Sequence, residues 1–124
     1  MLIRLLKAKL HMAAVTQTEL NYHGSVTIDR DLMDAVGLLP YEQVLIANTA
    51  NGLRGETYVI EGARGSGTIQ LNGALARFAE PTDRIIILAF AYASPQEAGD
   101  LKPKIAVLDE QNRIIEQWSG EIDS

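Results

Sequence analysis

The longest apolar run in the chain is IIILAFA, residues 85–91. It is too short to span a bilayer and has the length of a buried strand, so we expect a strand over residues 83–92. Around it, shorter strand-like runs recur between Gly, Asn and Pro residues. Many short strands at close spacing predict a mainly β fold, either a small barrel or a sandwich, with a few short helices. Periodicity does not choose between the two architectures.

The remaining elements follow from local signals. Gly37 ends an amphipathic helix, Asn51-Gly52 forms a hairpin turn, and Ser94 caps a short helix that has Pro95 at its first position. The expected strands cover residues 2–12, 26–28, 43–47, 53–60, 68–71, 83–92, 104–108 and 113–117. The expected helical segments cover residues 29–36, 74–78 and 94–98.

Composition restricts the class of protein. A chain of 124 residues that is 47% hydrophobic predicts one domain, residues 1–124, with a core of its own. The absence of cysteine excludes disulfides and cysteine metal sites, and together with the lack of a signal-peptide pattern it favours a cytoplasmic location. No membrane association is expected. The net charge of -5 argues against nucleic acid as a partner.

Common catalytic motifs are missing from the sequence. It contains no GxxxxGK[ST] phosphate loop, no HExxH and no GxSxG elbow. His11 and His23 are the only histidines, too few for a histidine-rich metal site, so we expect no metal.

Gly24-Ser25 is the pair with the most specific chemical potential. A serine hydroxyl can attack the preceding carbonyl carbon, and a glycine there tolerates the strained backbone that brings the two atoms together. The resulting ester can eliminate to dehydroalanine, which hydrolyses to a pyruvoyl group. That ketone can form a Schiff base with an amine and accept electrons, as pyridoxal cofactors do. Taken alone, the dipeptide favours a simple turn that leads into Val26.

Polar residues on two expected strands supply partners for such chemistry. Lys9 and His11 share a face of the first strand, as do Lys7 and Lys9. Arg54 offers a planar fork for a carboxylate, and Tyr58 on the same face of its strand offers a proton. Thr57 faces the other way, so it reaches the same site only through a bulge or a subunit interface.

Two further segments have the composition of a ligand-binding loop or turn. Asn72-Gly73-Ala74 combines a side-chain amide with accessible backbone N–H groups, and is also typical of a plain turn. Tyr22 belongs to the run Leu20-Asn21-Tyr22-His23-Gly24-Ser25-Val26 that contains the Gly24-Ser25 pair.

Together these residues resemble the bacterial aspartate 1-decarboxylase family of pyruvoyl enzymes. The resemblance extends over most of the first hundred residues and is weaker from Lys102 onward. The matching stretches are Lys9-Leu10-His11, Val15-Thr16, Leu20, Tyr22, Gly24-Ser25, Ile28-Asp29, Asn48, Asn51-Gly52, Arg54, Thr57-Tyr58, Arg64-Gly65-Ser66 and Asn72-Gly73-Ala74.

The resemblance implies a double-psi β-barrel, a homotetramer with active sites between subunits, and L-aspartate as the substrate that yields β-alanine for pantothenate synthesis. It implies cleavage between Gly24 and Ser25 into a β chain, residues 1–24, and an α chain, residues 25–124. The cofactor would be the pyruvoyl group derived from Ser25, without metal or pyridoxal phosphate.

The same resemblance implies a role for each site residue. Ser25 would form the Schiff base and Tyr58 would protonate the α-carbon. The substrate-binding residues would be Lys9, Arg54, Thr57, Gly73 and Ala74, and the supporting residues His11, Tyr22 and Asn72.

The sequence departs from the family where Ala47 replaces a frequent Trp, and the loop over residues 61–67 carries an extra residue relative to some members. Two other functions remain open from sequence. One is a pyruvoyl decarboxylase acting on a different small amino acid. The other is a non-catalytic swapped-hairpin barrel that binds DNA or another partner. The sequence does not reveal whether a maturation factor assists cleavage.

Overall fold

The computed structural model describes residues 1–119 as a mainly β protein, as the sequence predicts. The strands are β1 (Ile3–Ala14), β2 (Gln17–Glu19), β3 (Ser25–Asp29), β4 (Gln43–Asn48), β5 (Arg54–Gly62), β6 (Ile69–Asn72), β7 (Arg84–Ala93), β8 (Lys104–Leu108) and β9 (Ile114–Ser119). The helices are α1 (Arg30–Val36), the 3₁₀ helix η1 (Gly73–Phe78) and α2 (Pro95–Ala98).

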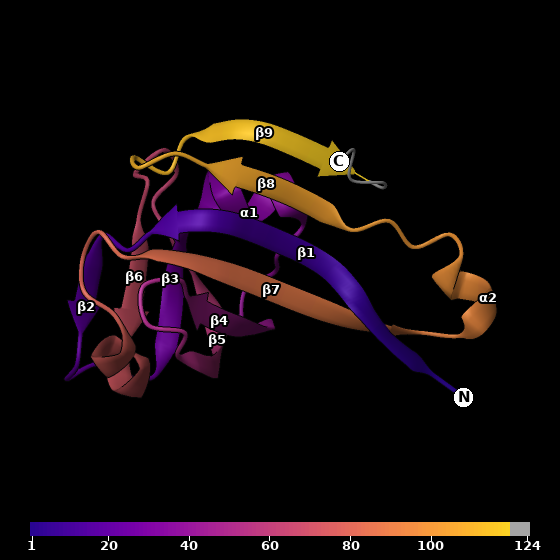
Figure 1. Cartoon of the computed structure of the whole chain (residues 1–124), viewed down its shortest axis with the longest axis horizontal. Coiled ribbons are helices and arrows are strands. Elements are labelled where there is room, and N and C mark those ends of the chain that lie inside the picture. The colour runs from indigo at the N-terminus through magenta and orange to yellow at the C-terminus, as the bar shows by residue number, and fades with distance from the viewer. Residues whose placement is uncertain (120–124) are drawn as a thin grey trace.

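The strands form one mixed sheet in the order β2-β6-β3-β5-β4-β7-β1-β8-β9. Three neighbouring pairs are parallel, namely β1–β8, β2–β6 and β3–β5, and the other pairs are antiparallel. Figure 1 shows β1 and β7 as a long ribbon that reaches α2 at one end, while β2, β3, β5 and β6 gather at the other.

Helix α1 and its end at Gly37 lie where the sequence predicts, with Asp29 as the N-cap instead of the first helical residue. Asp29 accepts a hydrogen bond from the Asp31 backbone N–H at 2.9 Å, and Gly37 ends the helix with a φ of 74°. The same Asp29 carboxylate accepts hydrogen bonds from the backbone N–H groups of Gly65, at 3.1 Å, and Gly67, at 2.8 Å. One buried carboxylate therefore ties the start of α1 to the loop after β5.

The core lies between α1 and the inward faces of the strands. Its fully buried side chains include Leu10, Ile28, Met33, Ile69 and Ile87. The expected strand over residues 83–92 is confirmed as β7, which pairs with β1 on one side and β4 on the other. A strand with neighbours on both sides and alternate side chains in the core explains the apolar run.

Strand β1 departs from the regular alternation that the sequence predicts. Its pairing with β7 shifts between Leu6 and Ala8 and again between Leu10 and Ala13. Met12 lies in the second irregularity with a φ of 64° and is half-buried. Lys7 lies in the first, and its ammonium binds the Glu42 carboxylate and the Gly37 carbonyl.

Strand β2 was not expected from the sequence. Gln17, Thr18 and Glu19 carry no apolar alternation, and the strand forms because Leu71 and its neighbours in β6 offer a parallel edge. Within residues 1–119, no helix is long and apolar enough to cross a membrane.

Candidate active site

Ser25 begins β3 and is almost completely buried, at 1% exposure. The Asn72 amide donates from Nδ2 to the Ser25 Oγ at 2.9 Å and to the Thr27 Oγ1 at 3.1 Å. The Ser25 hydroxyl has one acceptor, the His23 carbonyl, at a long 3.4 Å. A short bond from Asn72 and a long bond to His23 leave the hydroxyl oriented but weakly engaged as a donor.

Strand pairing explains why Asn72 meets Ser25. Strands β3 and β6 are antiparallel, with Ser25 opposite Asn72 and Thr27 opposite Gln70. Side chains two residues apart share a face of a strand, so Ser25, Thr27, Gln70 and Asn72 form one polar group. Gln70 Nε2 donates to Asn72 Oδ1 at 2.8 Å, which leaves the Asn72 NH₂ group directed at the two hydroxyls.

Gly24 lies directly before this group, in the link between Tyr22 and β3. Its φ is not positive, and a Cβ built on it meets no atom within 4 Å. The strained backbone expected at Gly24 is therefore not observed in the uncleaved chain. The glycine with a positive φ next to Ser25 is Gly73, at 72°, which directly follows the end of β6.

Strand β5 carries Arg54, Glu56 and Tyr58 on one face. Its pairing with β4 has no register shift between Arg54 and Tyr58, so the strand contains no bulge that would turn Thr57 toward them. Arg54, Glu56 and Tyr58 are exposed, whereas Thr57 is half-buried on the opposite face. A bulge in β5 therefore does not bring Thr57 to the site, which leaves a subunit interface as the other explanation.

Tyr58 is close to Ser25 in the sheet. Strands β3 and β5 are parallel, with Val26 opposite Val59. One step back along both strands places Ser25 beside Tyr58, on the face away from the core. The ring of Tyr41 flanks the Tyr58 ring at 6.3 Å between centroids.

Lys9 lies on the same face but several strands away. Glu56 pairs with Leu45, Leu45 with Leu88, and Leu88 with Lys9, so one row of side chains runs across four strands. At about 4.8 Å per strand, Lys9 is separated from β5 by about 14 Å along the sheet. Arg54 is four residues from Tyr58, which is about 13 Å along β5.

Within residues 1–119 the structure therefore brings together some of the expected site residues and separates others. Ser25, Tyr58, Asn72 and Gly73 are neighbours through β3, β5 and β6. Ala74 follows in η1 and is exposed, and Tyr22 is about half exposed beside His23. Lys9, His11 and Arg54 lie elsewhere on the sheet, and none of the three has a side-chain hydrogen bond or salt bridge within the described residues.

Burial and two cations shape the electrostatics around His11. Its Nδ1 atom is buried and has no hydrogen-bond partner among residues 1–119. Desolvation by burial, with the charges of Lys9 and Arg84, holds the pKa of His11 below its usual value. His11 is therefore neutral at physiological pH, and Lys9 is the cation of this segment.

Thr27, Gln70 and Tyr41 are site neighbours that the sequence analysis missed. Period-two alternation from Ser25 and Asn72 would have found the first two, because it places Thr27 and Gln70 on the same faces. No sequence pattern identifies Tyr41, which contacts Tyr58 through the chain reversal before β4.

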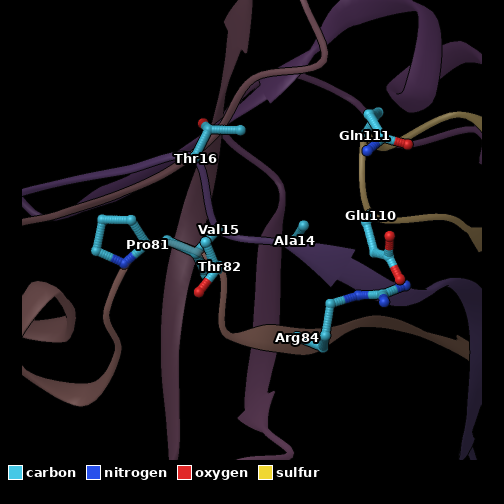
Figure 2. A pocket seen from close by; sticks show the side chains of 8 residues that line it. All are labelled: Ala14, Val15, Thr16, Pro81, Thr82, Arg84, Glu110 and Gln111. Atoms are coloured by element: carbon cyan, nitrogen blue, oxygen red, sulfur yellow. The ribbon is translucent and has the colours of Figure 1, made fainter.

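A pocket of about 470 Å³ lies away from these residues. It is lined by the ends of β1 and β7 and by the β8–β9 turn, and Figure 2 shows Glu110 directed toward Arg84 inside it. The Arg84 guanidinium is occupied by the carbonyl oxygens of Met12 and Leu108, both at 2.8 Å. This pocket contains none of the expected site residues. Across residues 1–119, no group of three or more potential metal ligands gathers.

Comparison with known proteins places these observations in a family. The sequence profile described as aspartate decarboxylase matches residues 1–115. The chain is 52% identical to the aspartate 1-decarboxylase of Bacillus subtilis (strain 168) over 117 residues, which cover 94% of this chain and 92% of that protein. It is 56% identical to the aspartate 1-decarboxylase of Shouchella clausii (strain KSM-K16), with the same coverage. The chain belongs to the aspartate decarboxylase family.

Proposed function

We propose that this enzyme decarboxylates L-aspartate to β-alanine and CO₂ after cutting its own backbone between Gly24 and Ser25. The observation that carries the proposal is the buried Ser25 hydroxyl, held by Asn72 at 2.9 Å in a chain over half identical to curated aspartate 1-decarboxylases. Cleavage would give a β chain, residues 1–24, and an α chain, residues 25–124. Both chains would stay within the single domain.

The proposed self-cleavage begins with an acyl shift. The Ser25 Oγ bonds to the carbonyl carbon of Gly24, the bond from that carbon to the Ser25 nitrogen breaks, and the hydroxyl proton passes to the nitrogen. Elimination then releases Gly24 as a carboxylate and leaves dehydroalanine at position 25. Water adds and ammonia departs, which gives a pyruvoyl group at the start of the α chain.

The surroundings of Ser25 fit such a group. The site is shielded from solvent, and Asn72 and Thr27 supply a donor and a hydroxyl next to it. A pyruvoyl group at this position would supply a ketone for the substrate amine and an acceptor for the electrons left when CO₂ departs. Asn72 keeps its donor aimed at this position because Gln70 occupies its other amide atom.

Each remaining residue acts through binding or proton transfer. Tyr58, in the row next to Ser25, would deliver the proton to the α-carbon from its phenol hydroxyl. Arg54 and Lys9 would hold the two substrate carboxylates and thereby orient the bond that breaks. Thr57, Gly73 and Ala74 would complete the pocket.

His11 and Tyr22 would support this pocket together with Asn72. His11 stands two residues from Lys9 on β1, and its neutral imidazole adds no third cation to the carboxylate-binding region. Tyr22 lies before the cleavage point, with its ring against that of His23 at 5.9 Å.

We further infer a double-psi β-barrel and a homotetramer with active sites between subunits. The three parallel pairings support a barrel in which strands from separate hairpins alternate. The separation of Lys9 and Arg54 from Ser25 supports a shared site, because aspartate is too small to bridge those distances within one chain. A neighbouring subunit would bring its Lys9 and Arg54 to Ser25. In the same arrangement, Thr57 would lie next to an active site formed between subunits.

The test is a substrate panel with purified enzyme. We expect β-alanine from L-aspartate, measured by amino-acid analysis, and no comparable product from L-glutamate. Turnover of another amino acid in place of aspartate would contradict the proposed substrate. Ala47 makes this panel informative, since it is buried opposite Arg54 in β4 and replaces a Trp that is frequent in the family.

In the cell we place this reaction in the cytoplasm, as a supply of β-alanine for pantothenate synthesis. Reconstitution from the purified chain alone would also reveal whether cleavage requires a maturation factor. A gel shift with random DNA addresses the non-catalytic alternative, and the net charge of -5 predicts no binding.

A further inference from the structure

We propose that Gly73 is a positioning residue for self-cleavage, because only a residue without a side chain lets the scissile peptide lie where Ser25 can attack it. The inference rests on the proposed self-cleavage between Gly24 and Ser25. It assigns to Gly73 a role in maturation, separate from any contact with substrate.

The sheet register places Gly73 against the scissile bond. In the antiparallel pair of β3 and β6, Ser25 is opposite Asn72. The residue before Ser25 therefore faces the residue after Asn72, which brings Gly24 next to Gly73. The two glycines meet because of the pairing, not because of their separation in sequence.

The contact between the two glycines leaves no room for a side chain. A Cβ on Gly73 would lie 2.8 Å from the Gly24 Cα, 3.0 Å from the Gly24 nitrogen and 3.1 Å from the Tyr22 carbonyl oxygen. All three are backbone atoms, which cannot move aside by rotating a side chain. The segment from Tyr22 to Gly24 would have to shift as a unit.

Such a shift would separate the two reacting atoms. The Ser25 Oγ is fixed from the β3–β6 side by Asn72, whose amide also binds Thr27. The Gly24 Cα and nitrogen border the position of a Cβ on Gly73, so a displacement of these atoms carries the adjoining Gly24 carbonyl carbon with them. Moving only the carbon lengthens the path over which the Oγ–C bond forms and the C–N bond breaks, with the proton passing from oxygen to nitrogen. A misplacement of about 1 Å can slow a reaction by about a hundredfold.

The two glycines are not equivalent in this respect. Gly24 has no positive φ and open space where its Cβ would lie. Gly73 has a φ of 72° and a contact that any Cβ would violate. The residue that must lack a side chain for steric reasons is therefore Gly73, at the end of β6, and not Gly24 at the cleavage point.

Gly65 provides a matched control. Its φ is 74°, so alanine there meets the same unfavourable backbone conformation, but a Cβ on Gly65 has no atom within 4 Å. Comparing Gly73→Ala with Gly65→Ala separates the steric contact from the backbone strain. Gly73→Asn is a second test variant, because asparagine tolerates positive φ while still carrying a Cβ.

The experiment follows cleavage of freshly synthesised chain by intact mass over time, with circular dichroism and thermal melting as tests of folding. We expect Gly65→Ala to cleave at the wild-type rate, and folded Gly73→Ala and Gly73→Asn to cleave about tenfold to a hundredfold more slowly. The readout needs no substrate, so it is independent of any effect on decarboxylation.

Equal cleavage of the Gly73 variants and Gly65→Ala would overturn the inference. Failure of both Gly73 variants to fold, with Gly65→Ala folded, would also overturn it, because Gly73 would then serve folding instead of positioning. If the wild-type chain itself remains uncleaved, the proposed function fails, a result distinct from either of these.

Discussion

At the scale of single residues, the proposed chemistry is divided between Ser25, a buried group, and Tyr58, an accessible one. Ser25 is 1% exposed, whereas Tyr58 is 37% exposed on the adjacent strand. A precursor of a cofactor benefits from shielding, and a proton donor must reach a substrate that enters from outside. The two environments match the two roles proposed for them.

Replacing Tyr58 separates maturation from turnover. Tyr58→Phe removes only a hydroxyl that has no hydrogen-bond partner within residues 1–119, so we expect normal folding and normal self-cleavage. Loss of the proton donor should lower kcat about a hundredfold or more with little change in KM, measured as β-alanine release.

The matched control is Tyr41→Phe, which alters the neighbouring ring in the same way and should leave kcat unchanged. Turnover near the wild-type value in Tyr58→Phe would remove Tyr58 from its role.

Sequence reasoning identified residue types better than residue geometry. Arg54 and Tyr58 share a face as period-two alternation requires. Lys7 and Lys9 were expected on one face of β1, but the pairing with β7 shifts between Leu6 and Ala8, at Lys7, and the Lys7 ammonium binds Glu42. The position of a β-bulge depends on the strand with which the bulged strand pairs, and the alternation of residues within one strand does not identify that partner.

At the scale of elements, Asn112 connects three segments that are distant in sequence. Its Oδ1 accepts from the Ala14 N–H at 2.7 Å, and its Nδ2 donates to the Ala14 and Gly67 carbonyls at 2.9 and 2.8 Å. It joins the β8–β9 turn to the end of β1 and to the loop before β6.

Substituting Asn112 with glycine should therefore destabilise the fold. Glycine accepts the positive φ of 61°, so the change removes the side-chain hydrogen bonds without adding backbone strain. Leaving the buried Ala14 groups unpaired should cost about 3 kcal/mol and lower the melting temperature by roughly 10 °C. The exposed neighbour serves as control, since Gln111→Gly adds the same chain flexibility; an equal loss in both variants would contradict the role of the Asn112 amide.

Asp83 gives the turn before β7 a pH-dependent stability. Hydrogen bonds from the Asn48 side chain and the Glu80 backbone N–H, both at 3.0 Å, hold the pKa of Asp83 below its usual value of 3.8. A carboxylate with a lowered pKa stabilises the fold above its unfolded pKa, and this stability is lost as the pH falls through the folded value.

We therefore expect Asp83→Asn to lose about 1 kcal/mol near neutral pH and to show a shallower decline in stability below about pH 4 than wild type. Urea unfolding at a series of pH values measures both effects. Asp100→Asn removes the same charge from an exposed position. Identical pH curves for wild type and Asp83→Asn would show that the hydrogen bonds do not stabilise the carboxylate.

Strand positions were predictable because burial imposes its period on local sequence, as in β7 and β5. Strand partners were not predictable in the same way. The parallel pairs β3–β5 and β1–β8 join segments that are far apart in sequence, and nothing in either segment specifies the other. The contact between Gly24 and Gly73 follows from another long-range pairing, the antiparallel one of β3 with β6, which is why sequence alone assigned the strain to Gly24.

At the scale of the whole molecule, the outer face of the sheet is incompletely covered in one chain. Leu45 and Leu88 are half-buried in the row between Glu56 and Lys9, and Tyr92 is exposed further along β7. An apolar band next to Lys9, the cation proposed to bind substrate, is suited to a subunit interface. Sequence could place Lys9 and Arg54 near catalysis only through family resemblance, because their distance from Ser25 within a chain depends on the fold.

The tetramer can be tested by light scattering coupled to size exclusion. We expect a particle of about four times the 13.6 kDa chain mass. Mixing inactive Ser25→Ala chains with inactive Arg54→Ala chains should restore some β-alanine formation if a site takes these residues from different subunits. A monomer with full activity would contradict a shared site.

The most direct measurement is the intact mass of the purified chain beside Ser25→Ala. The wild type should give two fragments that separate between Gly24 and Ser25, the larger one starting with a pyruvoyl group and blocked to amino-terminal sequencing. Ser25→Ala should fold, because Thr27 still accepts from Asn72, and should show one uncleaved, inactive mass. A single unbroken mass from an active wild-type enzyme, or two fragments from Ser25→Ala, would contradict self-cleavage at this serine.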